Sequence, residues 1–235
     1  MDEDLLSFLW NKVGPQQNRT KCPYHRIRNL FNLCSNVIHD GIVGDFVEVD
    51  VWKGGSSAVM GALCELEDEH RKTWSIDSFA GMSEPDTSVD LLDNETSAVA
   101  CLKDSTMLRN FDLDDFKRTC FEIIGLRRDT VRIVKGWAVD VLPLVRQADP
   151  KISVLRIDID WYEPTKQVLD DLYGLVTPGG YIICDDYGAW RGARKAIDEF
   201  REAHGISDEL TQTGDDSGGS QPSLLVGTEH WWRKR

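Results

Sequence analysis

The sequence predicts an α/β fold, in which helices cover both faces of a doubly wound, mostly parallel sheet. Short runs rich in Val and Ile alternate along the chain with longer segments whose apolar residues recur at helical spacing. Between residues 46 and 77 a strand, a Gly-Gly turn, a helix and a second strand follow one another, which is the order of a right-handed parallel crossover. Ligands of such sheets bind beyond the carboxyl ends of the strands, so chemistry is expected there.

The first 43 residues are expected to form a helical arm. An apolar patch followed by Gly14-Pro15 predicts a short helix and a loop over residues 1–20. Over residues 24–39 the apolar side chains recur at helical spacing, which predicts a second helix. Asp40-Gly41 breaks that pattern and ends the helix.

The first α/β unit follows the arm. The run Phe-Val-Glu-Val-Asp-Val over residues 46–51 predicts a strand, and Gly54-Gly55 follow it in a turn. Residues 58–66 predict a helix, and residues 73–77 predict the second strand. Residues 80–110 are mainly polar, with many Ser, Thr, Asp and Glu residues at 80–106, and we expect a mobile lid there, because long irregular stretches in compact domains are usually functional covers or disordered.

The second half of the chain continues the alternation. Further strands are predicted at residues 131–134, 152–159 and 181–184. Further helices are predicted at residues 113–124, 139–146, 162–175 and 193–203. A polar, Gly-rich loop at 211–222 precedes two late strands, at 223–227 and 229–232. The apolar run of 152–159 fits a strand at the centre of the sheet, buried on both faces.

Length, charge and cysteine content limit the class of protein. The 235 residues suit one domain, 1–235, with a continuous core. A net charge of −13 argues against nucleic acid as the main partner and against adhesion to an anionic membrane. Neither a secretory signal nor a spanning helix is evident, so a cytoplasmic protein is expected. None of the six cysteines forms a CxxC pair, which favours buried free thiols over disulfides or a zinc site.

The turn after the first predicted strand could bind a ligand. Gly54 and Gly55 permit close approach of the backbone, and the following helix offers free N–H groups. Glu48 suits a cationic amino group better than a pyrophosphate. The spacing is not GxGxxG, because Asp50 stands where the first glycine would be. An ordinary strand-to-helix turn is the alternative interpretation.

Asp77 ends the second predicted strand, 22 residues beyond Gly55. An acidic residue about 20 residues after such glycines typically binds ribose hydroxyls. Alone, Asp77 could equally be an exposed turn residue, but with the Gly-Gly turn it favours a nucleoside site.

A group of aspartates forms the strongest constellation. Asp158 and Asp160 end one predicted strand, and Asp185 and Asp186 end another. If the strands are neighbours, their ends lie within about 5–10 Å, and so many carboxylates repel one another unless a cation compensates. A divalent ion with oxygen ligands would do so, whereas helix capping and ion pairs are the structural alternative.

Aromatic residues stand beside these strand ends, where they could contact an adenine ring or a positively charged sulfonium. They are Trp52, Phe79, Trp137, Trp161, Tyr187 and Trp190. For each one, packing in the core or at the rim is the alternative role.

An ordered set of motifs, spanning residues 26–201, resembles the macrocin O-methyltransferase family, whose members methylate sugar hydroxyls on macrolides. The motifs are Gly44-Asp45-Phe46-Val47-Glu48, Val51-Trp52-Lys53-Gly54-Gly55, Asp77-Ser78-Phe79, Lys135-Gly136-Trp137, Leu155-Arg156-Ile157-Asp158-Ile159-Asp160, Pro178-Gly179-Gly180-Tyr181 and Asp185-Asp186-Tyr187-Gly188. The resemblance implies a class I methyltransferase fold, with seven strands of which the last is antiparallel. It also implies S-adenosylmethionine as methyl donor, Mg²⁺ or another divalent cation, and a homodimer or higher oligomer.

The resemblance assigns roles to single residues. Asp158, Asp185 and Asp186 would bind the metal. For the cofactor pocket the resemblance implies Glu48, Gly54, Gly55, Ser56, Asp77, Gly136 and Trp137, and the neighbouring residues extend the expected pocket to Asp50, Trp52, Ser78, Phe79 and Asp158. Within it, Glu48 would face the methionine end, Asp77 the ribose and Gly136-Trp137 the adenine. Family members commonly have Gly in place of Asp50, so its side chain would either crowd the cofactor or reach for it.

The expected reaction is methylation of a hydroxyl, on a sugar or another diol of a small natural product or glycan. The metal would lower the pKa of the hydroxyl, and Asp158, or else Asp160, would take the proton. Lys166 is a less favoured base. The alternatives from other classes are a metal-dependent nucleotide-sugar glycosyltransferase using the Asp158-x-Asp160 motif, a phosphotransferase, and a non-catalytic small-molecule binding module.

Overall fold

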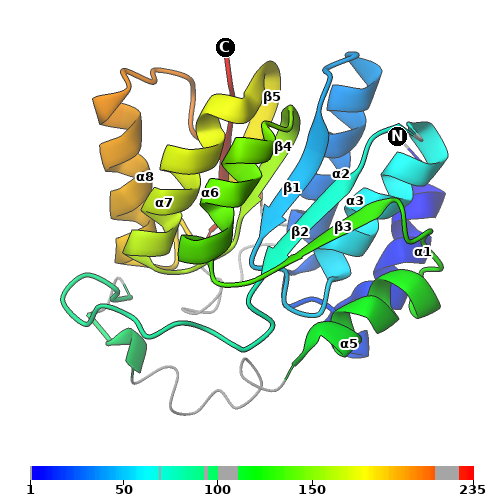
Figure 1. Ribbon diagram of the computed structural model, residues 1–235, viewed down its shortest axis with the longest axis horizontal. Coiled ribbons are helices and arrows are strands. Elements are labelled where there is room, and N and C mark those ends of the chain that lie inside the picture. The colour runs from blue at the N-terminus through cyan, green and yellow to red at the C-terminus, as the bar shows by residue number, and fades with distance from the viewer. Residues whose placement is uncertain (1, 69, 93–94, 100–110, 215–227) are drawn as a thin grey trace.

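The computed structural model describes residues 2–68, 70–92, 95–99, 111–214 and 228–235 of the chain. These residues form a seven-stranded sheet with the strand order β3-β2-β1-β4-β5-β7-β6 (Figure 1). β7 pairs with β5 and β6 in antiparallel fashion, and the other pairs are parallel. The predicted fold class is therefore confirmed, including the single antiparallel strand near the C-terminus.

The strands are β1 (Asp45–Val49), β2 (Thr73–Asp77), β3 (Val131–Lys135), β4 (Ile152–Ile157), β5 (Val176–Cys184), β6 (Thr211–Gln212) and β7 (His230–Arg233). The α-helices are α1 (Glu3–Val13), α2 (Tyr24–His39), α3 (Gly55–Glu67), α5 (Leu113–Lys117), α6 (Ala138–Ala148), α7 (Tyr162–Leu172) and α8 (Arg191–Ala203). Short 3₁₀ turns lie at Pro15–Gln17 and Tyr173–Leu175, and a π-helix, η3, spans Arg118–Ile123.

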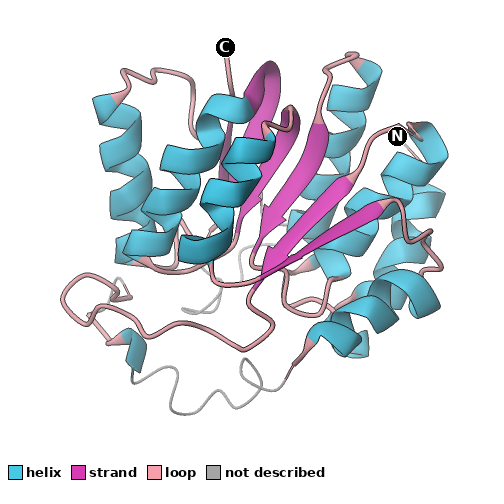
Figure 2. Cartoon of the chain, in the orientation of Figure 1, coloured by secondary structure: helices cyan, strands magenta, loops and turns pink. Residues whose placement is uncertain are grey.

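Helices cover both faces of the sheet (Figures 1 and 2). α6, α7 and α8 lie side by side on one face, and α1, α2 and α3 lie on the other. Successive β1 residues point to opposite faces: Phe46 joins the core under α2 and α3, whereas Val47 and Val49 join the core under α6 and α7. Burial on both faces explains why most residues of β1 and β4 are apolar.

Several boundaries differ from the sequence prediction. β1 ends at Val49 and β4 at Ile157, because the next residues leave the sheet as loops that carry the acidic side chains. β5 begins at Val176 rather than at 181, since Val176 pairs with Ile152 before a shift in register. β6 was not predicted. The strand predicted at 223–227 lies outside the described residues.

Part of the predicted lid is docked onto the domain. The isolated bridge between Leu92 and Trp190 joins this segment to the start of α8, and both residues belong to a small apolar cluster with Trp161. Asp90 also accepts the N–H of Tyr162, at the start of α7. Residues 93–94 and 100–110 lie outside the described residues, and movement of the lid stays a prediction.

Two further expectations concern cysteines and membranes. The five described cysteines, Cys22, Cys34, Cys64, Cys120 and Cys184, are buried free thiols, as predicted. Cys101 lies outside the described residues. Among the described helices, none has the length and apolar character required to cross a bilayer.

Candidate active site

The predicted site residues follow strands whose carboxyl ends meet at one edge of the sheet. Four non-glycine residues in these loops adopt left-handed backbone conformations: Asp50, Trp52, Phe79 and Asp160, with φ between 47° and 66°. Such conformations cost about 1–3 kcal/mol each and persist where the surrounding structure imposes them. Their concentration at one edge marks it as the candidate active site.

A cavity of about 590 Å³ opens at this edge. Of the residues predicted for the cofactor, its lining includes Asp50, Asp77, Ser78, Gly136 and Trp137. Trp161 and Met82 form another wall, next to Lys166 of α7. The other residues predicted for the cofactor lie outside this lining; they are Glu48, Trp52, Gly54, Gly55, Ser56, Phe79 and Asp158.

The carboxylate of Asp77 organises the loop after β1. It accepts hydrogen bonds from three backbone N–H groups, those of Val51, Trp52 and Phe79, at 2.9, 3.0 and 2.6 Å. Burial raises the pKa of Asp77 against the opposing effect of these bonds. Asp77 therefore fixes the shape of the cavity wall as well as facing the cavity.

The Gly-Gly turn is covered by other parts of the chain. Gly54 has a φ of 82°, and a side chain there would begin 2.6 Å from the ring of Phe116 in α5. The N–H of Gly55 donates to the carbonyl of Arg19 in the N-terminal arm. Arg19 in turn pairs with Asp115 at 3.4 Å, so the arm and α5 are joined above the turn. Only glycine fits such close packing at both positions.

Glu48 is fully buried beneath this turn. The hydroxyls of Ser56 and Ser57, at the start of α3, donate to its two carboxylate oxygens. Arg156 of β4 donates to Glu48 at 2.7 Å. Glu48 thus joins the Gly-Gly turn to the aspartates beyond β4.

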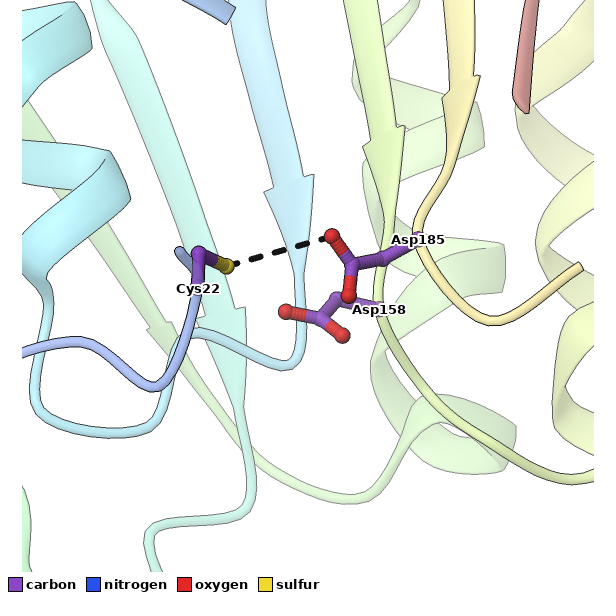
Figure 3. Close-up of side chains that lie close together, drawn as sticks. All are labelled: Cys22, Asp158 and Asp185. Atoms are coloured by element: carbon purple, nitrogen blue, oxygen red, sulfur yellow. Dashed lines mark hydrogen bonds between the residues drawn. The ribbon is translucent and has the colours of Figure 1, made fainter. Parts of the chain in front are cut away.

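The predicted aspartates meet around two buried arginines. Arg156 donates to Asp158 at 2.7 Å and to Asp185 at 2.5 Å, and Arg26 of α2 donates to the other oxygen of Asp185 at 2.5 Å. The Sγ atom of Cys22 lies 3.0 Å from Nη2 of Arg156 and 3.9 Å from Oδ1 of Asp185. Figure 3 shows Cys22, Asp158 and Asp185 converging from three separate segments. The adjacency of the two strand ends is confirmed, since β4 and β5 pair in parallel up to Ile157 and Cys184.

Asp160 and Asp186 form a second contact at the same edge. The backbone N–H of Asp160 donates to Asp186 at 3.0 Å, and the indole N–H of Trp190 donates to the Asp160 side chain at 2.8 Å. Burial, followed by neighbouring carboxylates, raises the pKa of Asp186. Burial also raises the pKa of Asp158, although Arg156 opposes it. The pKa of Asp185 is lowered, because Arg26 and Arg156 together outweigh its burial.

The donor set fits a divalent cation in part. Cys22, Asp158 and Asp185 offer potential ligand atoms that lie within 4.8 Å of one another. Carboxylate oxygens are the ligands preferred by Mg²⁺. Both oxygens of Asp185 already accept hydrogen bonds from arginine, so binding a cation there requires a guanidinium to move. Burial is the main cause of the raised pKa values of Asp158 and Asp186, and neighbouring carboxylates raise them further.

Glu229, which precedes β7, lies beside the same cluster. It is buried and accepts hydrogen bonds from Asn29 at 2.8 Å and from Thr213 at 2.7 Å. Burial, followed by the charge of Asp185, raises its pKa to about 7.

Sequence reasoning missed three residues of the cluster. Arg156 interrupts an otherwise apolar strand, and a charged residue in a strand expected to be buried on both faces indicates a buried ion pair. Arg26 and Cys22 gave no comparable indication, because their partners lie more than 100 positions away along the chain. The compensation that we assigned to a metal is supplied here, in part, by guanidinium groups.

Comparisons with known proteins agree with this architecture. The model of the family described as macrocin-O-methyltransferase (TylF) matches residues 10–218. A tetracenomycin 4′-O-methyltransferase of Streptomyces olivaceus, which acts on an 8-demethyl-8-(2,3-dimethoxy-α-L-rhamnosyl) derivative, is 35% identical over 212 residues, covering 90% of this chain and 77% of that protein. The mycinamicin III 3″-O-methyltransferase of Micromonospora griseorubida is 31% identical, covering 84% and 76%.

A solved structure shows the same fold with substantial sequence similarity. The O-methyltransferase NovP superposes with a TM-score of 0.74 at 28% identity, covering 92% of this chain and 82% of that chain. Its fold, the family match and the named relatives argue against the glycosyltransferase, phosphotransferase and binding-module alternatives. The chain belongs to the macrocin O-methyltransferase family and is an enzyme of the methyltransferase class.

Proposed function

We propose that this enzyme transfers a methyl group from S-adenosylmethionine to a hydroxyl of a sugar carried by a small natural product. One observation carries the proposal. A cavity lined by Asp77, Gly136 and Trp137 is also lined by Ile159, which follows Asp158 in the loop after β4. A nucleoside in the cavity would therefore lie next to the carboxylates that can take a proton.

The sugar acceptor is inferred from relatives. The Streptomyces olivaceus enzyme is named for a rhamnosyl-tetracenomycin, and the other relatives are named for mycinamicin III and for demethyldecarbamoylnovobiocin. These relatives share between 31% and 35% of aligned residues with this chain. A glycosylated natural product is therefore the acceptor class to test first.

The residues proposed for a divalent cation are Asp158, Asp185 and Asp186. When bound, such an ion would lower the pKa of the acceptor hydroxyl. Asp158 is our first candidate for the base and Asp160 our second. The side chain of Asp160 is held by Trp190, which fixes its direction. Because Asp185 forms ion pairs with both Arg26 and Arg156, we assign it a structural role in the cluster and not the transfer of a proton.

Methyl transfer can be tested with S-adenosylmethionine and a panel of rhamnosylated aromatic and macrolide acceptors, by measuring release of S-adenosylhomocysteine. We expect activity with at least one glycoside and none with its aglycone. Asp158→Asn should lower kcat by at least about 100-fold, the usual contribution of a general base. The control Asp129→Asn, whose side chain is 73% exposed, should stay within about twofold.

The metal is tested separately. Excess EDTA should abolish turnover, and Mg²⁺ or Mn²⁺ should restore it. Full activity in EDTA would rule out the metal while leaving methyl transfer in place. Failure of the wild-type protein to bind S-adenosylhomocysteine in calorimetry would rule out the methyl donor itself.

A further inference from the structure

Asp50 stands at the candidate active-site edge, at the position where a GxGxxG turn would have its first glycine. It follows β1 directly, and its backbone has a φ of 66°, in the left-handed region that glycine adopts most easily. Its N–H donates to the carbonyl of Ile76 at 2.8 Å, which fixes the backbone between β1 and β2. Asp tolerates this conformation better than most residues, so the fold accepts a side chain here.

Asp77 has little hydrogen-bonding capacity left for a ligand. An ionised carboxylate offers about four acceptor sites. Three of those on Asp77 accept the backbone N–H groups of Val51, Trp52 and Phe79. The carboxyl of Asp50 forms a further hydrogen bond to Asp77. Because three backbone N–H groups stabilise the ionised form of Asp77, we assign the shared proton to Asp50.

Asp50 therefore differs from its neighbour in what it can offer to the cavity. It lines the same 590 Å³ cavity as Asp77. Burial raises the pKa of Asp50 well above its ordinary value, and the charge of Asp77 raises it further. A carboxylic acid that donates its O–H to Asp77 still presents its carbonyl oxygen as an acceptor.

We propose that Asp50, rather than Asp77, recognises the ribose hydroxyls of the nucleoside bound in this cavity. The inference rests on the proposed function, because it takes S-adenosylmethionine as the occupant. The carbonyl oxygen of Asp50 accepts a hydrogen bond from the 2′- or 3′-hydroxyl, while Asp77 holds the acid group in position. In this arrangement Asp77 is a positioning residue and Asp50 makes the contact that selects a nucleoside with an intact ribose.

The test compares nucleosides that differ by one hydroxyl. Calorimetry would measure the Kd of adenosine, 2′-deoxyadenosine and 3′-deoxyadenosine for the wild-type protein, Asp50→Gly and Asp50→Asn. In the wild type, at least one deoxynucleoside should bind about tenfold more weakly than adenosine, as expected for one lost hydrogen bond. In Asp50→Gly this ratio should fall below about twofold. Asn keeps the carbonyl oxygen and can donate to Asp77, so Asp50→Asn should restore most of the ratio.

A matched control separates recognition from backbone effects. Asp149, an exposed residue at the end of α6, also has a left-handed backbone, with a φ of 51°. Asp149→Gly should leave the ratio unchanged, and thermal unfolding should show that both glycine variants are folded.

Three outcomes would overturn the inference. A ratio that stays near tenfold in Asp50→Gly would assign ribose recognition to Asp77. A wild-type protein that binds all three nucleosides equally would show that neither aspartate selects the ribose. If the wild type bound neither adenosine nor S-adenosylhomocysteine, the proposed function would fall together with the inference, and this result is distinct from the first two.

Discussion

Replacing Arg156 by Met should strongly destabilise the protein, because this guanidinium compensates three carboxylates at once. Its side chain is 1% exposed and bonds to Glu48 and Asp158 at 2.7 Å and to Asp185 at 2.5 Å. Removing one partner of a buried ion pair typically costs 3–5 kcal/mol, since the other charge stays buried and unpaired. Arg26 remains to pair with Asp185 and limits the loss. We therefore expect a loss of about 4 kcal/mol in the free energy of unfolding.

The assay is urea unfolding followed by tryptophan fluorescence and circular dichroism at pH 7.5. The control is Arg146→Met, since Arg146 pairs with Asp171 at 3.3 Å with its side chain 64% exposed, and such pairs contribute about 0–1 kcal/mol. In a protein of this size a loss of 4 kcal/mol lowers Tm by roughly 8–16 °C. The loss should shrink as pH falls, because protonated carboxyls need no counter-charge. A loss below about 1 kcal/mol, or one that does not depend on pH, would refute this reasoning.

Three further predictions test other parts of the site. Glu229→Gln should stabilise the protein above pH 7 by about 1–3 kcal/mol. The pKa of Glu229 is raised from 4.5 to about 7 in the folded protein, so ionised Glu229 destabilises the fold increasingly as pH rises from 4.5 to 7. Variant and wild type should therefore differ in stability at pH 8 and not at pH 4, and equal stability at pH 8 would contradict the prediction. Gly54→Ala should cost about 2 kcal/mol in denaturant unfolding, because Ala is strained at a φ of 82° and meets Phe116; an unchanged midpoint would show that the loop adjusts freely. Trp161→Ala should weaken S-adenosylhomocysteine binding at least about fivefold in calorimetry, since it removes a cavity wall that packs on Trp190 at a centroid distance of 4.9 Å; unchanged affinity would place the ligand elsewhere.

The sequence predicts strands well where both faces of the strand are buried, because the residues of the strand itself then show the pattern. β1, β2 and β4 were found because every one of their residues after Asp45 is buried, so the three strands are rich in Val, Ile and other apolar residues. β6 was missed because two residues cannot show a period and its only described strand partner is β7. The single helix predicted over 113–124 divides into α5 and the π-helix η3. In η3, Cys120 Sγ lies 4.0 Å from the carbonyl oxygen of Gly54, 66 positions away along the chain, a contact that no local pattern encodes.

Some contacts of the candidate site could likewise be predicted from the sequence, and others could not. Asp158 and Asp185 were expected to lie together if their strands were neighbours, and β4 and β5 do pair in parallel. The role of Asp77 in holding the loop could not be predicted, since it depends on a positive φ at Trp52 and Phe79 that neither residue type favours. Arg26 reaches Asp185 from the arm, and only the folded chain reveals that contact.

The long spacing of these contacts has a consequence for how the enzyme is made in the cell. Cys22 and Asp185 are 163 positions apart, and Asn29 and Glu229 are 200 apart. A ribosome adds about 5–20 residues each second, so the arm waits roughly 10–40 s for its partners to be synthesised. During that interval Arg26 lacks the carboxylate with which it pairs in the folded protein, although the apolar contacts between the arm and α3 can already form. The candidate active-site edge is therefore among the last parts to form, and a nascent chain that stops short of β5 cannot assemble it.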